Sequence, residues 1–208
     1  MKHVIKKSLI ASMASALVLG GSAVMAAGMD VPMIKVTPVL EGLDKPWDMN
    51  VRADGTMFFT EKCKGLSMRS PDGKVTNIYG MKGSSGYSSS GADLFCEGQA
   101  GMMGVAADRN FDQNRRLYVA STSNKYHGSG CKSNFERCDG NIVMRLTLSE
   151  DLKSVADRTD IVTDIQYKPF ESNQPFGGPG AHNGGRLRVG PGGYLWIAGG
   201  DRHRGICP

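Results

Sequence analysis

A turn followed by a short apolar strand recurs three times along this 208-residue chain and restricts the folds open to it. In each unit polar or glycine residues come first, and the three units are residues 54–59, 114–119 and 192–197. With Phe58, Tyr118 and Leu195 taken as equivalents, the units lie 60 and then 77 residues apart. No long stretch shows apolar residues at helical spacing, and glycine is abundant, at 28 residues. The pattern therefore predicts an all-β protein with many short strands.

Repeated units of this kind, joined by long loops, are typical of the blades of a β-propeller. The expected strands are 35–40, a turn and strand within 45–51, and then 56–61, 65–69, 74–79, 101–107, 116–122, 141–149, 160–166, 186–189 and 194–198. About three blades fit this length, whereas a closed ring has at least four. A β-sandwich of the same strands is the alternative, because strand spacing alone does not separate the two folds.

A β-hairpin with a polar residue at each end is expected near the C-terminal end of the sequence. The residues up to Val189 alternate between polar and apolar, residues 190–193 supply the turn, and the next five are apolar and aromatic. Because the two ends of a hairpin lie together, His182 and Asp201 are expected within hydrogen-bond reach. A carboxylate bonded to one imidazole nitrogen fixes the tautomer, so that the other nitrogen can accept a proton. The hairpin is therefore interpreted as one wall of an active site.

The first 26 residues predict a secretory signal peptide. Three lysines precede an apolar run over residues 8–20, and Val24 and Ala26 occupy the −3 and −1 positions of a cleavage site. The run is short for a membrane span, so residues 27–208 are expected to be periplasmic or secreted, without stable membrane insertion. An uncleaved anchor is the alternative. Removal of the same lysines lowers the net charge from +5 to +2, so basic charge gives no support for a nucleic-acid partner.

Export would permit disulfide bonds, and the chain holds five cysteines. Cys131 and Cys138 are near enough in sequence to close the loop between them, and Cys63 with Cys96 is the next plausible pair. Sequence alone does not fix the connectivity. Cys207 has no evident partner: a free thiol and an intermolecular bridge are possible, and a partner beyond the last residue is the preferred explanation.

Short motifs follow one another along residues 45–201. They are Lys-Pro-Trp-Asp at 45–48, Asp-Gly-Thr-Met at 54–57, Thr-Glu at 60–61, Gly-Gln-Ala-Gly-Met-Met-Gly-Val-Ala at 98–106, Asn-Phe at 110–111, Tyr-Val at 118–119, His-Asn-Gly-Gly-Arg-Leu at 182–187, Gly-Pro at 190–191 and Gly-Asp at 200–201. In this order they resemble the soluble pyrroloquinoline quinone (PQQ)-dependent glucose dehydrogenases, the glucose/sorbosone and aldose sugar dehydrogenase family. Each motif is weak alone, whereas the ordered set is fairly specific.

The resemblance implies a six-bladed β-propeller with PQQ in the mouth of its central channel, and about three of the blades fall within this chain. It implies a general base at His182, the carboxylate partner of that base at Asp201, and a residue of the PQQ and substrate site at Gln99. The implied reaction is oxidation of an aldose at its anomeric carbon, in which the base takes the hydroxyl proton while hydride passes to PQQ. The implied partners are the sugar and an external electron acceptor.

Two departures from the family pattern lead to further expectations. Ala181 stands where the glucose-oxidising members have Asp, which argues against glucose as the preferred substrate. The cationic residues for the PQQ carboxylates and the calcium ligands are expected beyond residue 208, so no metal ligand is assigned within the chain. The sequence is therefore expected to be an N-terminal portion that is inactive and poorly stable by itself.

Other functions also fit an exported propeller, because fold alone does not select one. A non-enzymatic module that binds sugar or protein is the main alternative, and a polarised base at His182 favours the enzyme. A calcium-dependent lactone hydrolase would need a carboxylate cluster at the channel mouth, and none is evident in the sequence. The sequence contains neither a Gly-x-Gly-x-x-Gly motif, a P-loop nor a Gly-x-Ser-x-Gly elbow, so nicotinamide, nucleotide and serine-hydrolase chemistry are not expected.

Overall fold

The computed structural model describes residues 33–126, 140–168, 178 and 180–201. The chain divides into two units, Met1–Val39 and Leu40–Pro208. In the first unit the described residues form no strand, so the strand expected over residues 35–40 is wrong. Val36 and Val39 are largely exposed, and a segment without a paired neighbour leaves its backbone groups to water. The signal peptide and its cleavage site lie outside the described residues and stay a prediction.

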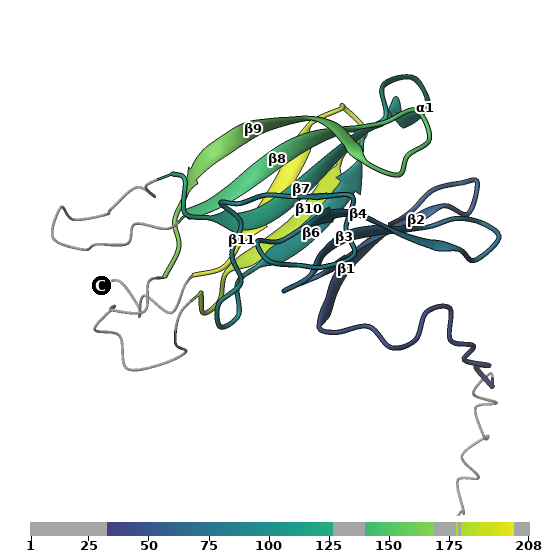
Figure 1. Cartoon of the computed structure of the whole chain (residues 1–208), viewed down its shortest axis with the longest axis horizontal. Helices are drawn as coiled ribbons and strands as arrows, with labels where there is room; N and C mark the ends of the chain where they lie inside the picture. Colours follow the sequence, from purple (N-terminus) through teal and green to yellow (C-terminus); the bar gives the residue numbers. More distant parts are fainter. Residues whose placement is uncertain (1–32, 127–139, 169–177, 179, 202–208) are drawn as a thin grey trace, which may run out of the picture. The chain divides into compact units, whose positions relative to one another are not determined.

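The second unit consists of three sheets whose consecutive strands pair antiparallel, with the exception of β4 and β5 (Figure 1). The first sheet holds β1 (Pro46–Val51), β2 (Met57–Glu61), β3 (Gly65–Arg69) and β4 (Val75–Gly80), with β5 (Ser89–Ser90) added parallel to β4. The second sheet holds β6 (Met102–Ala107), β7 (Arg116–Ser123), β8 (Gly140–Leu148) and β9 (Val155–Ile165). The third is the hairpin of β10 (Gly184–Val189) and β11 (Leu195–Gly199). A single-turn helix, α1 (Phe111–Asn114), precedes β7.

The strands predicted for this unit are confirmed to within two residues, except that β9 begins five residues earlier than expected. The repeat is confirmed as well, because Phe58, Tyr118 and Leu195 lie on β2, β7 and β11, the second strand of each sheet. Apart from the two-residue β5, each sheet is an up-and-down meander, which is the construction of a propeller blade. The protein is therefore nearly all-β, with about three blades of a β-propeller, the third of them present as a hairpin.

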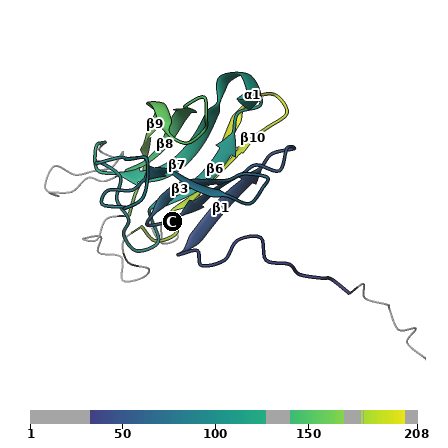
Figure 2. The ribbon, with the colours of Figure 1, turned by 45° about the vertical axis from the view of Figure 1, so that its right-hand side comes forward.

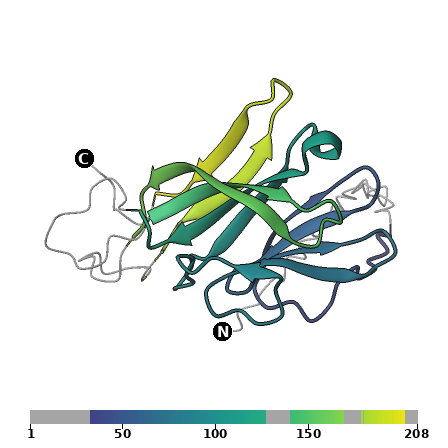
Figure 3. The ribbon, with the colours of Figure 1, turned by 45° about the horizontal axis from the view of Figure 1, so that its top comes forward.

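Strand β6 is the first strand of the second sheet. It lies beside β1 and β10, the first strands of the other two sheets (Figure 2). Figure 3 shows the hairpin, in yellow, alongside the second sheet, whose strands run from teal to green. One core cluster joins the first two sheets through fully buried side chains such as Phe58 and Ile142. A second cluster joins the second sheet to the hairpin, where Met103 packs with Leu187. The place of the hairpin is thus set by apolar contacts with the second sheet.

The Cys63–Cys96 disulfide is confirmed, with 5.1 Å between the two Cα atoms. The other three cysteines, Cys131, Cys138 and Cys207, lie outside the described residues. Among the residues that are described, no helix is long and apolar enough to cross a membrane.

Candidate active site

The hairpin brings His182 and Asp201 together, as the sequence predicts. Its first pair of opposed residues is Gly184 with Gly199, so His182 and Asp201 lie just beyond the same end of the ladder. The His182 Nδ1 and Asp201 Oδ1 atoms are 2.7 Å apart. This distance is that of a charge-assisted hydrogen bond, which holds the imidazole in one orientation and one tautomer.

Gln99 also contacts His182, from the turn that leads into the second sheet. It lies in a tight turn before β6, closed by hydrogen bonds in both directions between the backbones of Glu97 and Ala100, at 3.1 and 2.9 Å. The backbone N–H of His182 donates to Gln99 Oε1 at 3.1 Å, although 83 residues separate the two. All three candidate site residues are therefore assembled at one end of the first strands of the second and third sheets.

The backbone at His182 has an uncommon conformation that directs its side chain outward. Its φ is 49°, in the left-handed region that non-glycine residues seldom adopt. The neighbours on both sides, Ala181 and Asn183, are buried, whereas 45% of the His182 side chain is exposed. Strain of this kind costs of order 1 kcal/mol and persists only where surrounding contacts hold it. Buried neighbours thus anchor the segment and leave the imidazole at the surface.

Next to His182, the buried side-chain amides of Asn183 and Asn141 bond to each other. The sequence did not indicate this pair. Asn183 Nδ2 donates to Asn141 Oδ1 at 2.6 Å, and Asn141 Nδ2 donates back to Asn183 Oδ1 at 2.7 Å. Asn141 lies near the start of β8, so this pair ties the residue after His182 to the second sheet. The only signal in the sequence is an amide at the start of an apolar strand, which does not indicate its partner.

Gly200, which the sequence marks only as part of the Gly-Asp motif at 200–201, has a structural role of its own. A Cβ atom at this position would lie 1.8 Å from the backbone oxygen of His182. No side chain can be accommodated there without moving the His182 backbone. Gly200 therefore lets the two ends of the hairpin approach closely enough for His182 and Asp201 to bond.

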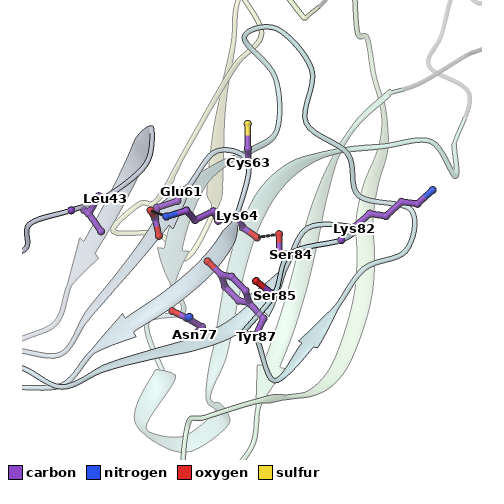
Figure 4. Close-up of a pocket in the computed structure, with 11 residues that line it drawn as sticks. Leu43, Glu61, Cys63, Lys64, Asn77, Lys82, Ser84, Ser85 and Tyr87 are labelled. Atoms are coloured by element: carbon purple, nitrogen blue, oxygen red, sulfur yellow. Dashed lines mark hydrogen bonds and ion pairs between the residues drawn. The ribbon is translucent and has the colours of Figure 1, made fainter.

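A separate pocket of about 570 Å³ opens on the first sheet (Figure 4). Lys64 and Glu61 form an ion pair in it at 3.0 Å, and Ser84 donates to the Lys64 backbone oxygen at 2.7 Å. Figure 4 shows the Lys82 side chain extending away from the other lining groups. The pocket lining includes none of the three candidate site residues, so it is not the candidate active site.

Comparison with known proteins decides the family. The family model described as Glucose / Sorbosone dehydrogenase matches residues 43–206, which include every residue of the site. This chain belongs to the glucose/sorbosone dehydrogenase family. No curated protein matches it.

Solved structures of similar fold bear names from the same family. A glucose dehydrogenase is 24% identical with a TM-score of 0.59, covering 82% of this chain and 42% of that one. The PQQ-bound aldose sugar dehydrogenase of Streptomyces coelicolor is 17% identical with a TM-score of 0.57, covering 80% and 41%. The apo form of the soluble aldose sugar dehydrogenase of Escherichia coli is 25% identical with a TM-score of 0.50, covering 78% and 39%. The chain thus spans about two fifths of the length of these family structures.

Within the described ranges, no group of three or more His, Cys, Asp and Glu side chains is arranged to hold a metal ion. The candidate site of this glucose/sorbosone dehydrogenase family member consists of an imidazole, a carboxylate and an amide. Such a set can bind a hydroxyl group and accept its proton.

Proposed function

We propose that this chain carries the catalytic base of a PQQ-dependent sugar dehydrogenase that acts in the periplasm or outside the cell. The observation that supports this most is the 2.7 Å contact between His182 and Asp201, with Gln99 bonded to the His182 backbone. Membership of the family supports the reaction class. PQQ is the molecule bound in the Streptomyces coelicolor relative, which supports it as the cofactor.

The turn that carries Gln99 has hydrogen-bond donors of the kind that PQQ, a planar anion rich in acceptors, would need. The side-chain oxygen of Gln99 accepts the hydrogen bond from the His182 backbone, so the side-chain nitrogen of Gln99 is the atom that can donate to a ligand. Lys62 lies against the same turn, where its amine donates to the Gly98 backbone oxygen. The pKa of Lys62 is lowered, first by burial and then by the nearby charge of Lys45, whereas the nearby carboxylate of Asp44 acts in the opposite direction.

In the proposed reaction His182 accepts the proton of the sugar's anomeric hydroxyl at Nε2, because Nδ1 is bonded to Asp201. PQQ, when bound, supplies the acceptor for the hydride that leaves the anomeric carbon. Asp201 keeps the imidazole oriented and stabilises the positive charge that the ring gains with the proton. Gln99 holds the His182 backbone in place through its hydrogen bond.

For the substrate we propose an aldose other than glucose. Ala181, which stands beside the base, is fully buried and has no polar group with which to bind a sugar hydroxyl. A calcium requirement and an external electron acceptor stay predictions from the family resemblance.

The test uses the longest natural protein that contains this chain, mixed with PQQ and calcium and followed by the quinone absorbance. Addition of a panel of aldoses should bleach the absorbance. His182→Ala should still bind PQQ but lose bleaching by a factor of about 10²–10⁴, the usual contribution of a general base. Asp157→Asn, an exposed carboxylate on β9, is the matched control and should leave the rate unchanged.

Bleaching that survives His182→Ala would overturn the role of the base. Binding of PQQ without bleaching by any aldose would overturn the substrate class. If PQQ does not bind at all, the enzyme proposal fails and a sugar- or protein-binding module takes its place.

A further inference from the structure

The turn that carries Gln99 is clamped against the first sheet, on the segment between β2 and β3. The Cys63–Cys96 disulfide joins this segment to the residue just before the turn, across 33 residues of sequence. On the other side of the turn, the backbone N–H of Met102 donates to the Lys62 backbone oxygen at 2.8 Å. The Lys62 amine donates to Gly98 within the turn itself. Lys62 and Cys63 therefore restrain three positions: the residue before the turn, the tip of the turn and the residues after it.

The backbones in this contact lie so close that the turn has little room to shift. A Cβ atom at Gly101 would lie 2.3 Å from the Lys62 backbone oxygen. From the opposite side, the Thr122 backbone N–H on β7 donates to the Gly101 oxygen at 3.1 Å. Gly101, where the turn ends, is thus fixed by contacts with two sheets, whereas the tip of the turn, Gly98 and Gln99, is exposed to solvent. The groups that restrain the tip decide where Gln99 Oε1 lies.

We propose that Lys62 and the Cys63–Cys96 disulfide are positioning residues for His182 that act through Gln99. They hold the turn so that Gln99 Oε1 stays 3.1 Å from the His182 N–H and fixes the left-handed backbone of that residue. The disulfide limits the freedom of the segment leading into the turn, and the Lys62 amine fixes its tip. The catalytic consequence of this inference rests on the proposed function, whereas the positioning itself does not.

The experiment measures hydrogen exchange of the His182 backbone amide by NMR, in protein without added PQQ. Gln99→Ala removes the acceptor and provides the reference for an unprotected amide. Lys62→Met keeps the length of the side chain and loses the amine, and Cys63→Ser with Cys96→Ser removes the disulfide. Each should raise the His182 exchange rate about five- to tenfold, the scale expected for loss of one hydrogen bond, toward the rate in Gln99→Ala. Amides paired between β7 and β8 should keep their rates.

Lys64→Met is the matched control, because Lys64 belongs to the same segment but pairs with Glu61 instead of the turn. It should leave the His182 amide unchanged. If the cysteine variant does not fold, Lys62→Met decides by itself. An unchanged His182 rate in Lys62→Met would overturn the proposal, and so would equal acceleration of the β7 and β8 amides, which indicates general destabilisation. A failure of the wild-type protein to reduce PQQ would overturn the proposed function and leave this result standing.

Discussion

Asp48 on β1 accepts a hydrogen bond from Arg186 on β10 at 2.7 Å, although 138 residues separate them. Only 2% of the Asp48 side chain is exposed. Its Oδ2 atom accepts from Arg188 at 3.0 Å and from the backbone N–H of Val105 on β6 at 3.2 Å. One buried carboxylate therefore joins the first strands of all three sheets, and it sets the position of the strand that follows His182.

Asp48→Ala should lower the free energy of unfolding by about 2 kcal/mol. The loss stays below the 3–5 kcal/mol typical of a broken buried pair, because both arginines are half exposed and can be hydrated. Urea unfolding followed by circular dichroism measures it. Asp54→Ala is the control, since the Asp54 side chain is 52% exposed, its ion pair with Arg52 contributes little, and its bond from the Thr56 backbone N–H lies within one turn. Equal effects of the two substitutions would contradict the role given to Asp48.

Asn183→Leu should destabilise the protein by about 1–3 kcal/mol, because it leaves the buried amide of Asn141 without its reciprocal partner. The variant in which both residues are Leu should lose less than the sum of the two single variants. A double-mutant cycle of unfolding free energies measures this coupling. Strict additivity would show that the two amides do not act as a pair.

His182→Gly should be more stable than His182→Ala by about 1 kcal/mol, because glycine adopts a φ of 49° without strain. Both variants lose the imidazole and its bond to Asp201, so those losses cancel in the comparison. Thermal unfolding of the two proteins gives the difference. The same pair of substitutions at Thr159, inside β9, should show the opposite order. Greater stability of the alanine variant at position 182 would contradict the strained backbone.

Stability should fall in acid through Asp93. Burial by itself raises the pKa of Asp93, but hydrogen bonds from Arg158 and Ser123 outweigh it and lower the pKa from 3.8 to about 2. A lowered pKa means that the stabilisation is complete above pH 3.8 and is lost as the pH falls toward 2. Asp93→Asn should therefore be less stable than wild type near neutral pH and should depend less on pH between 5 and about 2. Unfolding free energies across that range measure the effect, and parallel curves would refute it.

Most strands could be predicted because their signals are local. A strand such as Arg116–Ser123 contains the apolar run Leu-Tyr-Val-Ala, is preceded by a polar turn and pairs with its neighbours in sequence. The contact between His182 and Asp201 could also be predicted from local signals, since a tight turn brings the two ends of a hairpin together in any surroundings. The segment 35–40 shows the limit of such signals. Its residues favour a strand, but no neighbour pairs with it in the described part of the chain.

The sequence by itself thus determined the all-β class, the repeated units, the hairpin and the pairing of His182 with Asp201. Only the tertiary structure decided that Gln99 bonds to the His182 backbone and that Asn141 supports Asn183. The physical reason is that periodicity and turn residues depend on neighbours in the chain, whereas these contacts depend on how separate sheets pack. Which side chains meet between sheets follows from the packing of the apolar faces, and no single segment of sequence contains that information.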